Sequence, residues 1–318
     1  MGAAPGMIHS KHGVAARGTP RAALADIILV AGLLAAAIAA AVLYKNPAYF
    51  AQLSNISPVL LLAIAVPAAV TSVCAGQAWV HHRFAYKEFV QHNEVGGFII
   101  AVTGSLYAVV LGFLTVVAWQ QYTDARQLVA AESAAAADAW HVALGLPPLR
   151  RHRVRDDVLE YSRLMVSQEW PAMSRGDSNL QSAIVIMNAI GSTEDFTPAN
   201  LRESNAQTAT LAQLGVMHDD RQRRLADNRS GVMSFEWLVL IIGAVCVICF
   251  CWLFGLANAR VHLLMTSTVT IIITATLVLL FELQNPFRSG LGIDATDWSA
   301  VIDHIHFMQS APQSDMRM

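Results

Sequence analysis

The residues in this sequence with the strongest capacity for chemistry are three cysteines that lie close together. Cys246 and Cys249 have the CxxC spacing, and Cys251 follows two residues later. Such a spacing can bind a soft metal ion or form a redox pair. All three cysteines lie in a run of Ile, Val and Phe, and no second pair of Cys or His residues faces them. We therefore interpret them as small packing residues.

Histidine and acidic side chains form two further groups that could bind a divalent ion. His218, Asp219 and Asp220 are consecutive, so on a helix they point in different directions rather than toward one ion. His304 and His306 in the C-terminal tail are equally weak candidates. The sequence has no P-loop, no Gly-x-Ser-x-Gly turn and no His-Glu-x-x-His zinc helix. We expect no catalytic residues, no metal and no cofactor, and predict that the protein is not an enzyme.

Polar groups within apolar segments could contribute to ion conduction rather than to catalysis. Thr266, Thr270 and Thr274 repeat every four residues and so form one stripe on a helix. Their hydroxyls can bond to the carbonyl one turn back and join helices, or they can line a polar pathway. Glu236 and Glu282 lie at the ends of apolar runs, where water can hydrate them or where they can select ions.

A run of four arginines opens one polar segment, where the helix dipole disfavours positive charge. The four are Arg150, Arg151, Arg153 and Arg155. We expect salt bridges to the nearby acidic residues Asp156, Asp157 and Glu160. Anionic lipid headgroups, or a role as an anion reservoir at a pore mouth, are the alternatives.

Composition places these groups in a membrane protein. The chain has 318 residues and a mean hydropathy of +0.44. Only 14% of its residues are charged, against about 25% in an ordinary soluble domain. A formal net charge of -2 gives no reason to expect a nucleic-acid partner. The lipid bilayer is the expected partner.

Five apolar segments are long enough to cross a bilayer. We predict an all-α polytopic protein with spans at 22–44, 59–80, 96–120, 235–256 and 261–283. A polar tail, 1–21, precedes them, and a tail, 284–318, follows them with an expected amphipathic helix at 297–308. The region 121–231 has helical patterns throughout and is predicted to form an extramembrane bundle between the third and fourth spans.

The third span is the organising element of the chain. It carries no charge from Gly96 to Trp119, and neither Gly nor Pro interrupts the sequence after Gly112 until Gly145, so one helix is expected to leave the membrane and continue in water. Small residues occupy one face of it as a candidate surface for packing within or between subunits, or for lining a pore. They are Gly97, Ala101, Gly104, Ala108 and Gly112.

The same span offers groups that could touch an ion. Carbonyls beside Gly104 and Gly112, and the hydroxyls of Ser105 and Thr115, could contact a permeant ion. Phe113 is a candidate for a hydrophobic constriction, as is Phe98.

Within the bundle, two carboxylates have natural cationic partners. We expect Glu132 and Glu169 to pair with Arg221 and Arg224 in a structural network, with a role in an ion path as the alternative. The last helix of the bundle is expected to begin at Pro198, capped by Thr197.

Charges in the short loops predict the orientation. Lys11, Arg17 and Arg21, then Arg83 and Lys87, then Arg260, all fall on one side of a five-span protein. By the positive-inside rule that side is the cytoplasm of a bacterial inner membrane, which leaves the helical domain extracytoplasmic. Arginines before the fourth span oppose this orientation, namely Arg221, Arg223, Arg224 and Arg229.

The order of several motifs resembles a family of bacterial membrane proteins labelled as bestrophin-like. The matching residues, in order, are Val95-Gly96, Tyr107, Leu111-Gly112-Phe113, Trp119-Gln120-Gln121-Tyr122, Ala125, Glu132-Ser133-Ala134, Tyr161, Glu169-Trp170-Pro171, Arg221, Arg224-Leu225 and Asn285-Pro286-Phe287-x-Ser289-Gly290. The match covers roughly residues 79–304. The Glu-Trp-Pro triplet and the Pro-Phe-x-Ser-Gly turn are its most specific parts.

The resemblance implies an ion channel. Bestrophins are pentameric anion channels, and the family shares their order of two spans, a helical insertion and two spans. The resemblance therefore implies a homo-oligomer, a pentamer by analogy, that conducts small ions along the third span. A membrane scaffold or sensor whose helical domain binds a partner is the alternative. Two departures are the additional first span and the missing proline near Met233 and Ser234. No acidic run resembles the bestrophin calcium clasp, so calcium gating is not expected.

Overall fold

Every described element of the protein is a helix. The computed structural model describes residues 56–83, 90, 93–229, 234–288 and 290–310, and no strand occurs among them. The predicted all-α class is confirmed. The predicted tail 1–21 and first span 22–44 lie outside the described residues.

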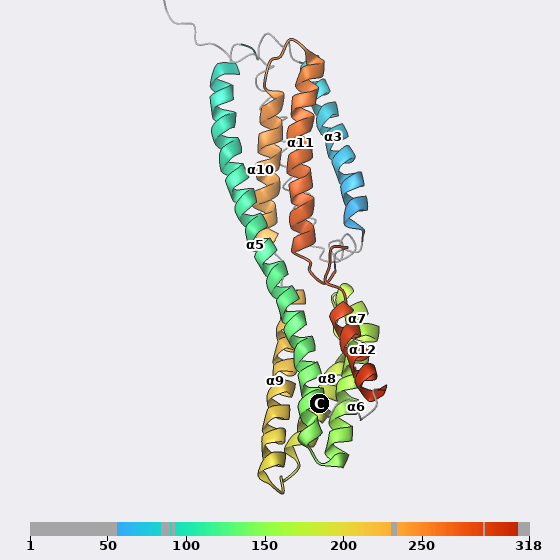
Figure 1. Ribbon diagram of the computed structural model, residues 1–318. Coiled ribbons are helices and arrows are strands. Elements are labelled where there is room, and N and C mark those ends of the chain that lie inside the picture. The colour runs from blue at the N-terminus through green and yellow to red at the C-terminus, as the bar shows by residue number, and fades with distance from the viewer. Residues whose placement is uncertain (1–55, 84–89, 91–92, 230–233, 289, 311–318) are drawn as a thin grey trace, which may run out of the picture.

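A single long helix, α5 (Asn93–Val142), joins the two halves of the molecule. At 1.5 Å per residue its 50 residues extend about 75 Å, more than twice the roughly 30 Å of a hydrocarbon core. Its first half lies among the apolar helices and its second half among the polar ones (Figure 1). The helix runs unbroken beyond Trp119, as the lack of Gly and Pro predicts.

The apolar half contains three further helices, and all four are long and apolar enough to span a membrane. They are α3 (Pro58–Arg83), α10 (Ser234–Trp252) and α11 (Ala259–Leu283). α3 packs against α11, while α5 contacts both α10 and α11. The turn between α10 and α11 is fixed by Asn258, whose side-chain oxygen accepts hydrogen bonds from the N–H groups of Arg260 and Val261.

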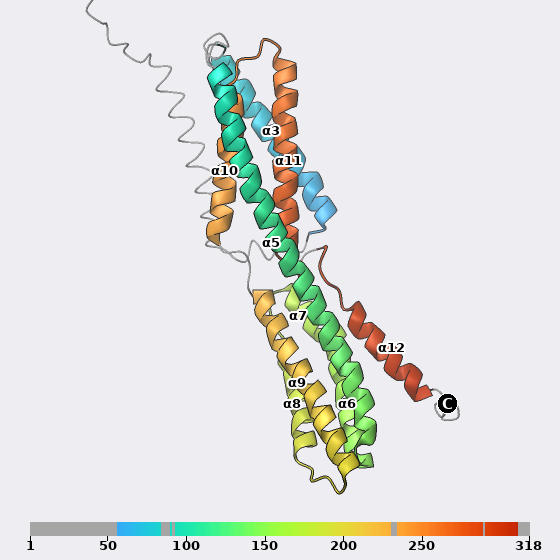
Figure 2. The ribbon, with the colours of Figure 1, turned by 60° about the vertical axis from the view of Figure 1, so that its left-hand side comes forward.

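The polar half is a bundle built around the second half of α5 (Figure 2). Its elements are the 3₁₀ turn η1 (Ala143–Gly145), α6 (Pro148–Leu164), the π-helical turn η2 (Met165–Glu169), α7 (Trp170–Ser174), α8 (Leu180–Glu194), α9 (Leu201–Arg229) and α12 (Thr296–Ser310). Large side chains fill the space between these helices, among them Trp140, Tyr161, Met165 and Trp298. The bundle therefore has a hydrophobic core of its own.

Helix α9 begins three residues later than its sequence signal indicated. Pro198 lies in the loop, and the first helical residue is Leu201. The side-chain oxygen of Asn200 accepts a hydrogen bond from the N–H of Glu203 at 3.0 Å, and the Glu203 carboxylate accepts one from the N–H of Ala199 at 2.9 Å. This reciprocal pair of bonds, similar to a capping box, satisfies the free amide of Glu203 in the first turn and places the cap at Asn200, so the predicted Thr197 cap is wrong.

Replacing Asn200 with alanine is expected to lower the free energy of unfolding by about 1 kcal/mol, because the cap of α9 is lost. Replacing Thr197 with alanine should change it by less than about 0.5 kcal/mol, the usual range for a surface substitution. Thermal unfolding of the detergent-solubilised protein compares the two variants. Equal losses would mean that Asn200 is not the cap of α9.

Candidate functional site

Four charged side chains meet in the interior of the bundle. Arg224 of α9 holds Glu132 of α5 through two hydrogen bonds, from Nε at 2.6 Å and from Nη2 at 3.1 Å. Arg221, one turn earlier on the same helix, donates to Glu169 of η2 at 3.0 Å. The Arg224 and Glu169 side chains also approach to 3.9 Å. The structure thus brings together the four residues that the sequence suggested, with equal numbers of positive and negative charges.

The local sequence explains how these residues converge. Arg221 and Arg224 are three residues apart and share one face of α9. Glu169 ends the π-helical turn two residues before Pro171, which has no N–H to donate to the preceding turn. A wider turn accommodates that missing hydrogen bond. Pro171 does not end the helical segment, because α7 continues to Ser174.

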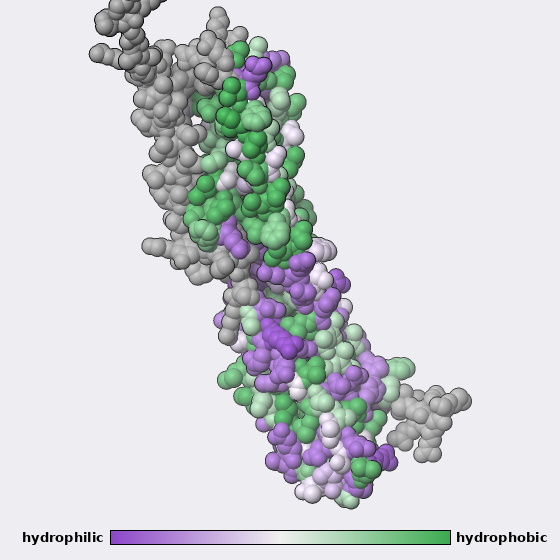
Figure 3. Space-filling model, turned by 90° about the vertical axis from the view of Figure 1, so that its left-hand side faces the viewer, coloured by the Kyte–Doolittle hydropathy of each residue, from purple (hydrophilic) through white to green (hydrophobic). Residues whose placement is uncertain are grey.

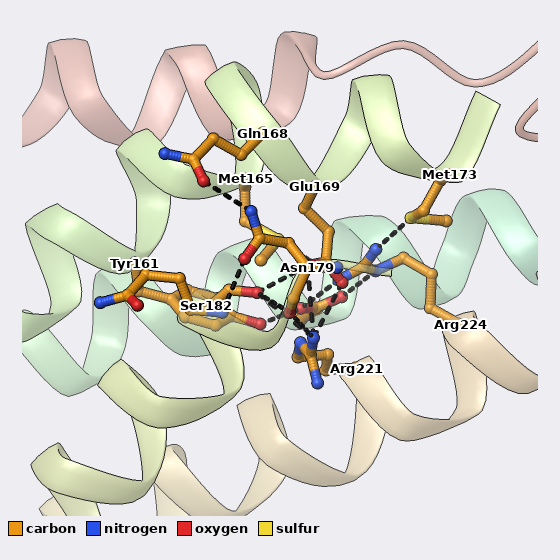
Figure 4. Close-up of polar contacts among 11 residues, drawn as sticks. Tyr161, Met165, Gln168, Glu169, Met173, Asn179, Ser182, Arg221 and Arg224 are labelled. Carbon is orange, nitrogen blue, oxygen red and sulfur yellow. Dashed lines mark hydrogen bonds and ion pairs between the residues drawn. The ribbon is translucent and has the colours of Figure 1, made fainter. Parts of the chain in front are cut away.

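Neutral side chains complete this group of residues (Figure 4). We name the whole group the buried ion cluster; its members are Glu132, Glu169, Arg221, Arg224, Tyr161, Ser182 and Asn179. The Tyr161 hydroxyl donates to Glu132 at 2.6 Å, and the Ser182 hydroxyl donates to Glu169 at 2.6 Å. The N–H of Asn179 also donates to Glu169, at 3.1 Å. Ser182 and Asn179 carried no signal in the sequence that linked them to Glu169.

Burial and charge together keep Arg224 charged and Tyr161 neutral. Burial alone would lower the pKa of Arg224, but the Glu132 carboxylate raises it above its usual value. Burial raises the pKa of Tyr161 well above its usual value, and Glu132 adds to that effect. The side chains of Glu132, Glu169 and Arg224 have no exposure in this subunit. Such an arrangement joins helices rather than exchanging ions with solvent.

The cluster connects to the chain that leaves the membrane after α11. Trp170 donates from its indole N–H to the carbonyl of Ile293 at 2.9 Å, and its ring meets the edge of Phe287 with centroids 6.1 Å apart. Pro286 and Phe287 are both buried here. Arg288 donates to the side-chain oxygen of Asn228 near the end of α9, at 3.2 Å. The Pro-Phe-x-Ser-Gly motif therefore ties the last membrane helix to the bundle.

The small-residue face of α5 meets no other part of the chain that the structure describes, and we name it the open face. A side chain added at Gly97, Gly104 or Gly112 would meet no described atom within 4 Å. Ala101 and Ala108 are exposed as well, and so are Phe98 and Phe113, the latter at 67%. Packing of this face against another described helix of the same subunit is therefore excluded. Figure 3 shows the hydrophobic surface of this half of the molecule beside the polar surface of the bundle.

Hydroxyl groups on α5 are engaged with their own helix. Ser105 donates to the carbonyl of Ala101 at 2.6 Å, and Thr115 donates to that of Leu111 at 2.8 Å. Their oxygen lone pairs stay available to accept a bond. Ser105 is exposed and Thr115 is half-buried.

Aromatic residues on α5 have different surroundings. Tyr107 faces α10, where its hydroxyl donates to the carbonyl of Leu240 at 3.2 Å. Trp119 is 59% exposed and stacks on Tyr122 with ring centroids 6.2 Å apart. The Tyr122 hydroxyl donates to the carbonyl of Leu291, a second link between α5 and the chain after α11.

The threonine stripe of α11 faces the interior of the subunit. Thr266 and Thr270 are buried, and the Thr270 hydroxyl donates to the carbonyl of Thr266 at 2.8 Å. The adjacent Ser267 lies 3.3 Å from the Cys74 sulfur of α3. Glu282 is buried, so the expectation that water hydrates it at the end of its span is wrong for this subunit. These contacts favour the helix-joining interpretation of the stripe.

The remaining candidates for chemistry do not converge. Within the described residues, no group of three His, Cys, Asp or Glu side chains could hold a metal ion. Cys246 is exposed and Cys249 is buried, and both are free thiols. His218 is half-buried, Asp219 exposed and Asp220 buried, as expected for consecutive residues around a helix.

The arginine run of α6 uses partners that the sequence did not suggest. Arg150 donates to the carbonyl of Ser192 at 2.9 Å, and Arg151 donates to that of Leu146 at 3.2 Å. The Arg155 guanidinium lies 3.3 Å from the centre of the Trp140 ring. Carbonyls at the ends of neighbouring turns and an aromatic face thus offset part of the positive charge. The expected acidic residues add to this, since Asp156 attracts Arg155 and Asp157 attracts Arg153.

Comparison with solved structures shows a shared fold. A crystal structure of a point variant of a membrane protein aligns with a TM-score of 0.59 at 13% identity, over 77% of this chain and 99% of that one. A point variant of a bacterial bestrophin homologue from Klebsiella pneumoniae aligns with a TM-score of 0.58 at 12% identity, over 76% of this chain and 99% of that one. Another structure of the Klebsiella pneumoniae homologue aligns with a TM-score of 0.53 at 15% identity, over 75% and 95%.

Sequence comparison gives the family. No curated protein matches the chain significantly. The profile of the Bestrophin-like domain matches residues 68–297, which include α5, the buried ion cluster and the Pro-Phe-x-Ser-Gly motif. The protein is therefore a membrane protein of the bestrophin-like family.

Proposed function

We propose that the chain assembles into a homo-oligomer that conducts small ions, with the open face of α5 toward the conduction path. The observation that carries this proposal is the combination of a charge-free membrane span and a face without a described partner in the subunit. Small residues there allow close approach of backbones, whose carbonyls can replace part of the water around an ion. Phe113 on the same stretch would narrow the path.

The family supports both parts of the proposal. The structures that share this fold include bacterial bestrophin homologues, and the resemblance to bestrophins implies a pentamer and an anion as the permeant species. Phe98 and Phe113 are exposed in the single subunit, so either lipid or a neighbouring subunit covers this face. An enzymatic role has no support from the residues described above.

The subunit orientation is part of the proposal. With the span 22–44 in place, the short-loop charges put the N-terminus in the cytoplasm and the helical domain outside the inner membrane. Reporter fusions after α9 and at the C-terminus would test it. Cytoplasmic activity of the reporter at both sites would reverse the orientation and leave the conduction proposal standing.

A non-conducting scaffold or sensor is the second candidate, and one surface favours it. Leu180, Ile184 and Met187 form an exposed apolar stripe along α8, on the part of the chain that lies outside the membrane. Residues spaced by four and three lie on one helical face and suit a protein partner.

Ion flux from liposomes that hold the purified full-length protein separates the two candidates. Chloride, potassium and proton release are compared with empty liposomes, and particle mass is measured on the same samples. Conduction predicts release of at least one ion from particles larger than one subunit. A stable oligomer that releases none of the three ions contradicts conduction and favours the scaffold.

A further inference from the structure

The C-terminal helix α12 is attached to the bundle by apolar contacts along its inner face. Trp298, Val301 and Ile305 are buried in the core of the bundle, and the Trp298 ring meets Tyr161 with centroids 5.4 Å apart. The helix packs against α5 and α6. It follows the linker that comes directly from the last membrane helix (Figure 1).

Two histidines flank Ile305, and each contacts a different helix. His304 Nε2 lies 2.9 Å from the Nε2 atom of His141, near the end of α5. His306 Nε2 lies 3.4 Å from Nη2 of Arg163 on α6. Neither contact was expected from the sequence, since the partners are more than 140 residues apart.

The chemistry of both contacts requires neutral imidazole. Between His141 and His304, one ring must donate a proton and the other must accept it, so two protonated rings cannot form the bond. A guanidinium only donates, so His306 must be the acceptor for Arg163. Protonation of His306 replaces its contact with Arg163 by a repulsion between positive charges, and protonation of both His141 and His304 does the same to the contact between them.

Most of the charges around His141 act in the same direction. Burial lowers the pKa of His141, His304 and Arg155 of α6 lower it further, and only Asp138 on α5 opposes them. On α12 itself, the carboxylate nearest to the two histidines in the sequence is that of Asp303, which is exposed. A lowered pKa in the docked state means that docking is favoured above the pKa of the released ring and lost as pH falls.

We propose that the His141–His304 and His306–Arg163 contacts form a proton-released clasp, which holds the C-terminal half of α12 on α5 and α6 at neutral pH and frees it in acid. Released imidazoles titrate near pH 6.5, so the change should begin at about that pH. Docking should weaken by at most about tenfold per pH unit for each proton taken up. The inference concerns the bundle alone and holds whether or not the protein conducts ions.

Hydrogen exchange of the full-length protein in detergent tests the clasp. The protection factor of residues 301–310 is compared at pH 7.5 and pH 5.5, after correction for the intrinsic pH dependence of exchange. We expect the protection factor of the wild type to fall by about tenfold or more. This is the effect of taking up one proton over about one pH unit of the interval. Protection in α9, which carries no residue of the clasp, should stay constant.

The matched variant carries His304→Gln and His306→Gln, since glutamine can form hydrogen bonds but does not titrate. Its protection in α12 should change less than twofold over the same interval. An unchanged protection factor in the wild type, or an equal fall in the variant, would overturn the clasp. If the variant is already unprotected at pH 7.5, His141→Gln decides: a smaller pH response than the wild type supports the clasp, and an identical response refutes it.

Discussion

Replacing Arg224 with methionine is expected to lower the free energy of unfolding of the helical domain by about 3–5 kcal/mol, because the Glu132 carboxylate would be buried without its cation. Both side chains have no exposure, and the pair is held at 2.6 Å. Glu169, 3.9 Å from Arg224, would also lose part of its compensation. Thermal and denaturant unfolding of the solubilised protein measure the loss.

A neighbouring arginine on the same helix supplies the control. Arg223 pairs with Asp220 at 3.4 Å, but its side chain is 70% exposed. Arg223→Met should therefore cost less than about 1 kcal/mol. Combining Arg224→Met with Glu132→Met removes both charges and should recover part of the loss. Similar losses for Arg223→Met and Arg224→Met would mean that the buried ion cluster does not stabilise the domain.

Replacing Gly243 with leucine is expected to separate α10 from α5. A Cβ atom at Gly243 would lie 2.5 Å from the Tyr107 ring, whose hydroxyl is bonded to Leu240. Overpacking of this kind costs about 1–3 kcal/mol or more. The measured quantities are thermal stability, particle mass and ion flux. Of these three, we expect thermal stability to be the first to fall.

Gly112→Leu is the matched substitution at a glycine that faces no other described part of the subunit. No described atom lies within 4 Å of a Cβ there, so the fold of the subunit should keep its stability. Any loss of assembly or flux in this variant then reports on the open face of α5. A loss of subunit stability equal to that of Gly243→Leu would contradict the placement of this face.

The parts of the fold that depend on local sequence could be predicted. The absence of Gly and Pro between Gly112 and Gly145 was sufficient to predict one helix that crosses the membrane and continues outside it. The pairing of Glu132 and Glu169 with Arg221 and Arg224 was also predicted, from opposite charges within one expected helical bundle. The first prediction rests on helix-forming sequence and the second on charge complementarity, and neither needs the tertiary structure.

The remaining features depend on tertiary contacts that no local pattern encodes. Gly97 and Gly243 are both glycines in apolar helices, but one faces open space and the other a tyrosine ring. His141 and His304 meet only because α12 returns to the end of α5. The capping residue of α9 was misplaced because Thr197 and Asn200 are both suitable caps, and only the reciprocal bond with Glu203 distinguishes them.

The most direct test of the proposed function is block of ion flux by a charged, water-soluble thiol reagent after cysteine substitution on α5, with the four native cysteines replaced. Ala108 lies on the open face, whereas Ala118 is buried against the neighbouring membrane helices. Our account predicts that labelled Ala108→Cys loses most of its flux and that Ala118→Cys, exposed to the same reagent, keeps it. Full flux through the Ala108→Cys variant, with labelling verified by mass, would contradict an ion path along this face of α5.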